Sequence, residues 1–172
     1  MAKEFSLPKL VRRAHQKKKS LGLFLNRVKR NPPKDLQKQV KAADEATWAE
    51  VECLSCANCC RTMTPTFKKS EVKVIATHLK MSYKQYFDKY LMIDDDNGDI
   101  VNRIQPCQHL NLKDNKCSIY AIRPSDCSGF PHHVRKDFLW QIENKTYLGN
   151  IPRCPATLIF VEKLQQAMEG AK

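Results

Sequence analysis

The sequence predicts a small, helix-rich α+β fold of irregular shape, with one or two short β-hairpins and an amphipathic helix near its N-terminus. Three observations support this class. Apolar residues recur at helical spacing over several segments, Asn97-Gly98 is a strong hairpin signal, and all eight cysteines follow residue 52. The 172 residues suit one domain with an appendage, and they are enough to bury an apolar core.

Two helices are predicted before the first cysteine. Residues 6–30 carry apolar side chains at three- and four-residue steps with Lys and Arg on the other face, and Pro32-Pro33 ends the pattern. Asp35 is expected to cap a second helix, which places five side chains on one face: Leu36, Val40, Ala43, Thr47 and Val51. We therefore expect a basic helical arm over residues 1–48 and a cysteine-cluster domain over residues 49–172.

Shorter elements are predicted after the first cysteines. Ser70 is expected to cap one helix, and Ser82 with Gln85 has the spacing of a capping box that begins another. Residues 91–104 are expected to form a hairpin that turns at Asn97-Gly98, because apolar segments flank this turn pair.

The last third of the chain contains one strong helical pattern. A second small hairpin is possible over residues 112–117, whereas residues 134–144 fit a strand or a helix equally well. Pro124 is expected to open a short helical turn as its first residue. From Pro155 to Met168, apolar side chains with polar backing predict a helix.

Charge is concentrated in the N-terminal segment. The net charge is +12, and residues 1–48 hold 13 Lys and Arg against 4 Asp and Glu. The helix at 6–30 therefore permits three interpretations: it contacts nucleic acid, it lies on an anionic membrane surface, or its apolar stripe simply packs on the domain or on a protein partner. The candidate phosphate-binding residues are Lys17, Lys18, Lys19, Arg27 and Arg30.

The compartment can be inferred from what the sequence lacks. It contains no stretch of eighteen apolar residues that would predict a transmembrane segment, and its first thirty residues lack the apolar region of a signal peptide. We therefore expect a cytoplasmic protein, in which thiols stay reduced. A disulfide framework would need an oxidising compartment, so the eight cysteines require another explanation.

The cysteines are the strongest functional signal. Four of them fall within the eight residues CLSCANCC, which is not the pattern of an apolar core. Thiolates select soft metals, so the candidates are an iron–sulfur cluster, of the [4Fe-4S] type, or zinc. The predicted metal ligands are Cys53, Cys56, Cys59, Cys60, Cys107, Cys117, Cys127 and Cys154.

The spacing of these cysteines leaves the type of centre open. The run Cys53-x2-Cys56-x2-Cys59 is similar to bacterial ferredoxin ligation, with Cys154-Pro155 as a distant element. Tetrahedral zinc with four thiolates is the alternative, and eight thiols would fill two such sites. Because neighbouring side chains are expected to diverge, Cys59 and Cys60 favour a polynuclear cluster or two adjacent sites.

The motifs together resemble the YkgJ-type cysteine-cluster family, named for CxxCxxCC and described as zinc- or iron-chelating. The resemblance covers about residues 50–160 and rests on four features: CLSCANCC, Pro106-Cys107, CSIYAIRPSDCSGFP from Cys117 to Pro131, and Cys154-Pro155. It implies a small helix-rich α+β domain that binds metal through its eight cysteines. Related domains include flagellin lysine methylases, in which an iron–sulfur cluster accompanies methyl transfer.

Several residues near the cysteines are candidates for supporting the metal. Arg123 can donate hydrogen bonds to sulfur or to a carboxylate, with Tyr120 three residues before it. Phe130 can shield the site from water, and His132 and His133 are candidate ligands or proton carriers.

Three functions are compatible with these features. The first is a metal-binding protein in electron transfer or metal handling. The second is a metal-dependent redox or group-transfer enzyme, and the third is a zinc-stabilised adaptor for nucleic acid or protein. The sequence alone does not choose between an enzyme and a binding protein.

Overall fold

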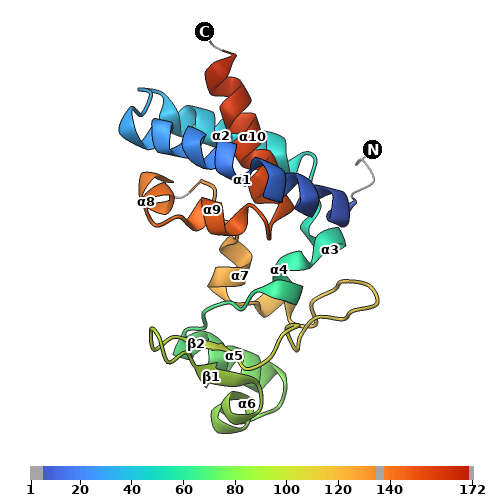
Figure 1. Cartoon of the computed structure of the whole chain (residues 1–172). Helices are drawn as coiled ribbons and strands as arrows, with labels where there is room; N and C mark the ends of the chain where they lie inside the picture. Colours follow the sequence, from blue (N-terminus) through green and yellow to red (C-terminus); the bar gives the residue numbers. More distant parts are fainter. Residues whose placement is uncertain (1–5, 135–137, 171–172) are drawn as a thin grey trace. The chain divides into compact units, whose positions relative to one another are not determined.

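The computed structural model describes residues 6–134 and 138–170 (Figure 1). It is rich in helices and contains a two-stranded antiparallel sheet, so the predicted α+β class is confirmed. The chain folds as two compact units: residues 1–56 with 131–172, which we call the helical unit, and residues 57–130, which we call the thiol unit. The predicted boundary between an arm and a domain after residue 48 is a separate question and stays a prediction.

The helical unit contains both long and short helices. The long ones confirm the predicted apolar periodicity: α1 (Leu7–Arg30), α2 (Leu36–Trp48) and α10 (Pro155–Glu169). The short ones are α3 (Cys53–Cys56), α8 (Phe138–Glu143) and α9 (Thr146–Asn150). As predicted, Asp35 is the N-cap residue of α2 and Pro155 is the first residue of α10. The ambiguous segment 134–144 is helical over 138–143, while 135–137 lie outside the described residues.

The core of the helical unit forms where α10 packs against α1 and α2 (Figure 1). From α1 it takes five buried side chains: Ala14, Leu21, Phe24, Leu25 and Val28. The apolar stripe of α1 is therefore used within the fold, and the interpretation in which this stripe packs on the protein is confirmed. A membrane-surface helix would need that same stripe for lipid. In the described part of the chain, none of the helices combines the length and apolar character that a membrane span requires.

The thiol unit is assembled from short elements. Its helices are α4 (Asn58–Thr62), α5 (Lys69–His78), α6 (Tyr83–Tyr90), the 3-10 helix η1 (Tyr120–Ile122) and α7 (Ser125–Gly129). Its strands are β1 (Leu91–Ile93) and β2 (Ile100–Asn102). A small apolar core joins α5, α6 and the hairpin, and its buried members are Phe67, Val72, Ile75, Ala76, Tyr86, Leu91, Ile100 and Ile119.

The hairpin predicted over residues 91–104 is confirmed. Strands β1 and β2 pair antiparallel with Met92 opposite Val101, and Gly98 adopts a φ of +75°, which a glycine tolerates without strain. The second hairpin is reduced to a single antiparallel bridge between Leu110 and Cys117. This bridge fixes the backbone of one predicted metal ligand.

Two predicted helix starts differ by one or two residues. Ser70 does not cap α5: Lys68 is its N-cap, and the Lys68 amide donates to the Glu71 carboxylate at 2.8 Å. Glu71 also accepts from the amide of Ser125 at 2.8 Å, so a long-range contact selects this start. Pro124 is the N-cap of α7 rather than its first residue. The capping box of Ser82 and Gln85 in α6 is confirmed.

Candidate metal centre

All eight cysteines lie in the described part of the chain, and none of them is in a disulfide. The division between the two units falls inside the CxxCxxCC run, after Cys56. Cys53, Cys56 and Cys154 belong to the helical unit, and the other five belong to the thiol unit. Ala57, buried and left-handed with a φ of 48°, separates α3 from α4. The thiol unit by itself thus holds five of the eight predicted ligands.

Cys59 and Cys60 point to the same side of α4. Their Sγ atoms are 4.0 Å apart, so the expectation that neighbouring side chains would diverge is wrong. The physical reason is that successive residues of a helix differ by a rotation of about 100°, not by the reversal of a strand. A tetrahedral zinc with Zn–S bonds of about 2.3 Å has S–S edges of about 3.8 Å. The pair is thus spaced almost as one edge of a mononuclear thiolate site.

The thiol of Cys60 ionises more easily than those of Cys107, Cys117, Cys127 and Cys154. A hydrogen bond from the Cys59 thiol lowers the pKa of Cys60 to about 7, although burial opposes this shift. The backbone amide of Cys60 and the positive charge of Arg61 also lower its pKa. The thiolate is the form that binds metal, and a substantial fraction of Cys60 is thiolate at neutral pH.

Three further thiols share this environment. Burial raises the pKa of Cys107, Cys117 and Cys127, in the last case to about 12, and a negative charge on Cys60 raises all three further. Cys107 is tied to Cys60 directly, since its amide donates to the Cys60 carbonyl at 2.8 Å. A cation removes this mutual repulsion, so metal binding and loss of the thiol protons are coupled.

The thiol donors suit a soft metal, but they lie too far apart to coordinate one ion in this conformation. Among the described residues, no three His, Cys, Asp or Glu side chains are close enough together to hold a metal ion. The Cys59–Cys60 edge is already near its bound spacing, so binding requires Cys107, Cys117 or Cys127 to close on it. All five thiols of this unit are half-buried, which leaves a route for an ion to enter.

A buried polar group beside these thiols was not predicted from sequence. The Tyr86 hydroxyl and His109 Nε2 are 2.7 Å apart, and both side chains are buried. Burial lowers the pKa of His109 to about 4, so its imidazole is neutral, and burial raises the pKa of Tyr86 to about 12. The available signal in the sequence was that His109 lies two residues after Cys107.

The predicted supporting residues differ in what they contact. The Arg123 guanidinium lies 3.8 Å from the centre of the Tyr120 ring, and its Nη1 donates to the Tyr120 carbonyl. Its charge lowers the pKa of Cys117, against the larger effect of burial. Phe130 is half-buried at the end of the thiol unit, and whether it shields the metal stays a prediction.

The two histidines belong to the helical unit. His133 is buried, its Nδ1 lies 2.8 Å from the Asp44 carboxylate, and its ring stacks on Phe160 at 4.1 Å. Its Nε2 has no hydrogen-bond partner among the described residues. His132 has a left-handed backbone with a φ of 62°, and its carbonyl accepts from Gln141. Their predicted metal role stays a prediction.

Cys154 is the most buried of the eight cysteines, with 9% of its surface exposed. It is the N-cap residue of α10. Burial raises the pKa of its thiol, and the amide and hydroxyl of Thr157 oppose that shift. This surrounding keeps Cys154 protonated at neutral pH unless a cation is bound.

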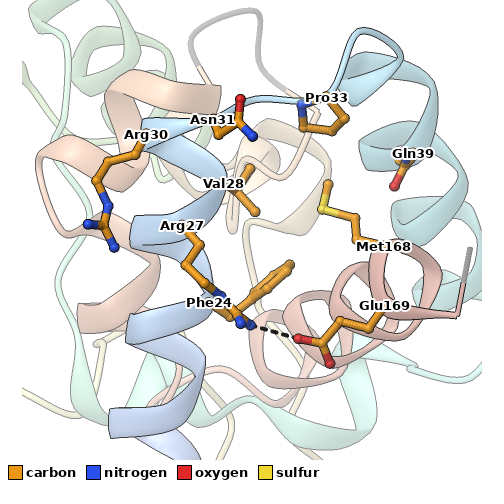
Figure 2. Close-up of a pocket in the computed structure, with 9 residues that line it drawn as sticks. All are labelled: Phe24, Arg27, Val28, Arg30, Asn31, Pro33, Gln39, Met168 and Glu169. Atoms are coloured by element: carbon orange, nitrogen blue, oxygen red, sulfur yellow. Dashed lines mark hydrogen bonds and ion pairs between the residues drawn. The ribbon is translucent and has the colours of Figure 1, made fainter. Parts of the chain in front are cut away.

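A cavity of about 660 Å³ opens elsewhere in the helical unit (Figure 2). Its wall is mainly apolar, with Phe24, Val28, Pro33 and Met168, and the ion pair between Arg27 and Glu169 lies at its edge (Figure 2). No cysteine lines it, so it is separate from the thiols.

Fold and thiols together define a cysteine-rich, metal-binding class of protein. Residues 52–154 match the CxxCxxCC family, described as "Putative zinc- or iron-chelating domain". The chain belongs to this family, and metal binding of this general kind follows from that membership.

The chain is 30% identical over 84 residues to an uncharacterized protein of Methanocaldococcus jannaschii. The matched segment covers 48% of this chain and 45% of that relative. The chain thus spans about half the length of the relative it matches. No solved structure matches.

Proposed function

We propose that the thiol unit binds one metal ion, zinc or iron, in a tetrahedral thiolate site, and that the protein handles this metal. The observation that supports the proposal is the Cys59–Cys60 pair, with sulfur atoms 4.0 Å apart and a Cys60 pKa of about 7. The remaining two ligands would come from Cys107, Cys117 and Cys127. When bound, the ion supplies the positive charge that four neighbouring thiolates need.

The half-buried state of the ligands favours metal handling over a purely structural role. Each of the five thiols in this unit is partly accessible, and Cys60 can attack as a thiolate near neutral pH. An incoming thiol can therefore displace the existing ligands one at a time. A fully buried site would exchange its metal only after local unfolding.

An iron–sulfur cluster for electron transfer is the second candidate. Five thiols in one unit exceed the four that a tetrahedral ion uses, and the sequence assigns Cys53, Cys56 and Cys154 to metal as well. In a [4Fe-4S] cluster each cysteine binds a different iron, so the Cys59 and Cys60 sulfurs would have to separate beyond 4.0 Å if both were ligands.

Anaerobic purification followed by metal and sulfide analysis tests both candidates. The first predicts one zinc or iron per chain without acid-labile sulfide, and the second predicts a brown protein with iron and sulfide. Cys60→Ser should lower the metal content at least tenfold, whereas Ser55→Ala, inside the same motif, should keep it. Full metal content in Cys60→Ser would remove Cys60 from the site.

A further inference from the structure

We propose that the exposed side of α1 binds the phosphate backbone of double-stranded DNA without reading its sequence. The residues involved form a single row, which we call the outer row: Arg12, Gln16, Lys19, Leu23, Asn26 and Arg30. All six are exposed. The inference concerns the helical unit and does not depend on the metal.

The fold determines which way this row faces. Because Leu21, Phe24 and Leu25 are buried in the core, α1 cannot rotate about its axis. Arg12, Lys19 and Arg30 are separated by seven and eleven positions, which are close to two and three helical turns. They therefore lie in line on the side opposite the core.

Acidic side chains neutralise the flanks of α1 but not its outer row. The segment from Leu7 to Arg30 contains no Asp or Glu. The cations on the flanks of α1 form ion pairs. Glu162 pairs with Arg13 and Lys17, Glu169 pairs with Arg27, and Glu143 pairs with Lys29. Within residues 6–134 and 138–170, no carboxylate forms an ion pair with a cation of the outer row. Lys17 and Arg27 were predicted to contact phosphate, but both already form ion pairs within the fold. The proposed phosphate-binding cations are therefore Arg12, Lys19 and Arg30.

The charge near the N-terminus of α1 works against the helix. Its first turn has no acidic residue, and Ser6 makes no side-chain capping bond. A positive charge near a helix N-terminus is unfavourable by about 0.3–1 kcal/mol, because the exposed amides there already carry positive charge. Lys9, which lies in this first turn three residues before Arg12, thus contradicts a local rule of stability, and such conflicts are typical of functional positions.

The composition of the outer row selects the partner. It has no aromatic side chain on which unpaired bases could stack, and a single apolar residue, Leu23, is too little for a lipid surface. Amides such as those of Gln16 and Asn26 commonly donate to phosphate oxygens. From Arg12 to Arg30 the row is straight and about 27 Å long, comparable to the roughly 34 Å of one DNA turn.

Fluorescence anisotropy with a labelled 24-base-pair DNA of arbitrary sequence tests this proposal on the full chain as purified. With three phosphate contacts, affinity should fall about 40-fold between 50 and 200 mM salt, and the salt slope should be about −2.7. The triple variant Arg12→Gln, Lys19→Gln, Arg30→Gln should bring the slope from about −2.7 to near zero. The matched control, Lys38→Gln, Lys73→Gln, Lys113→Gln, removes the same charge elsewhere and should bind like wild type.

Several outcomes would overturn the proposal. One is no change in anisotropy at 25 mM salt; another is equal loss of affinity in the two triple variants. Tighter binding to single-stranded DNA or duplex RNA would reject duplex DNA as the partner. Binding of a labelled poly-glutamate peptide through the same row, at higher affinity than DNA, would assign the row to an acidic protein. Circular dichroism confirms that each variant is folded.

Discussion

The helical unit buries a core of large aromatic and aliphatic side chains from long helices, whereas the thiol unit has a smaller core and keeps five cysteines half-buried beside it. In the first, apolar burial offsets the loss of conformational entropy directly. In the second, thiols occupy positions that apolar side chains would otherwise fill, and their pKa values rise through burial and mutual charge. With the metal site proposed above, we therefore expect metal to contribute to folding mainly in the thiol unit.

Removal of the metal should have the largest effect on stability, and it should affect the thiol unit more than the helical unit. Structural thiolate sites supply on the order of 10 kcal/mol of folding free energy, so a chelator should open the thiol unit first. Hydrogen exchange measured by mass spectrometry should then show lost protection in α5, α6 and β1, while α1 and α10 stay protected. Equal loss in both units would contradict the comparison.

Truncation of the aromatic core should destabilise the helical unit and leave the metal content unchanged. Phe160 is fully buried and stacks on His133, so Phe160→Ala should cost about 3–5 kcal/mol through lost burial and a cavity. Denaturant unfolding checks the cost, and metal analysis should show unchanged content. The control is Ile159→Ala, a half-buried neighbour, for which we expect a clearly smaller loss.

The buried carboxylate of Glu162 should have an intermediate effect. Its ion pairs with Arg13 and Lys17 lower its pKa, against the opposing effect of burial. Glu162→Gln should cost about 1–2 kcal/mol, because both cations are half-exposed and water screens them. Glu169→Gln, which breaks an exposed pair with Arg27, should cost less than about 0.5 kcal/mol in the same denaturation assay.

Because the pKa of Glu162 is lower in the folded than in the unfolded chain, its stabilisation is present above the ordinary pKa of 4.5 and is lost as pH falls through the folded value. Wild type should therefore lose more stability in acid than Glu162→Gln does. Identical acid profiles would show that the carboxylate is not paired in solution.

The smallest predicted effect is a pH dependence from His133. Burial lowers its pKa below 6.5, although Asp44 opposes the shift. The unfolded chain then binds more protons below pH 6.5, so stability falls as pH decreases from 6.5 to the folded pKa, by about 1.4 kcal/mol per pKa unit. His133→Asn should flatten this part of the profile, and the exposed control His15→Asn should not.

Local patterns predicted much of the fold. The helices at α1 and α10 follow from apolar spacing, the start of α6 from the Ser82 and Gln85 box, and the hairpin from Asn97-Gly98. Each of these signals acts between residues close in sequence. The helix start at Lys68 was missed because Glu71 also binds Ser125, which is 54 positions away.

The sequence by itself established a helix-rich α+β protein with a soft-metal thiol set, since cysteine spacing and apolar periodicity are local properties. Long-range packing determined the rest. It placed Glu162 under α1 as the partner of Arg13 and Lys17, and it set His109 against Tyr86 beside the thiols. It also determined which side of α1 carries unneutralised charge, because that depends on acids more than a hundred residues away along the chain.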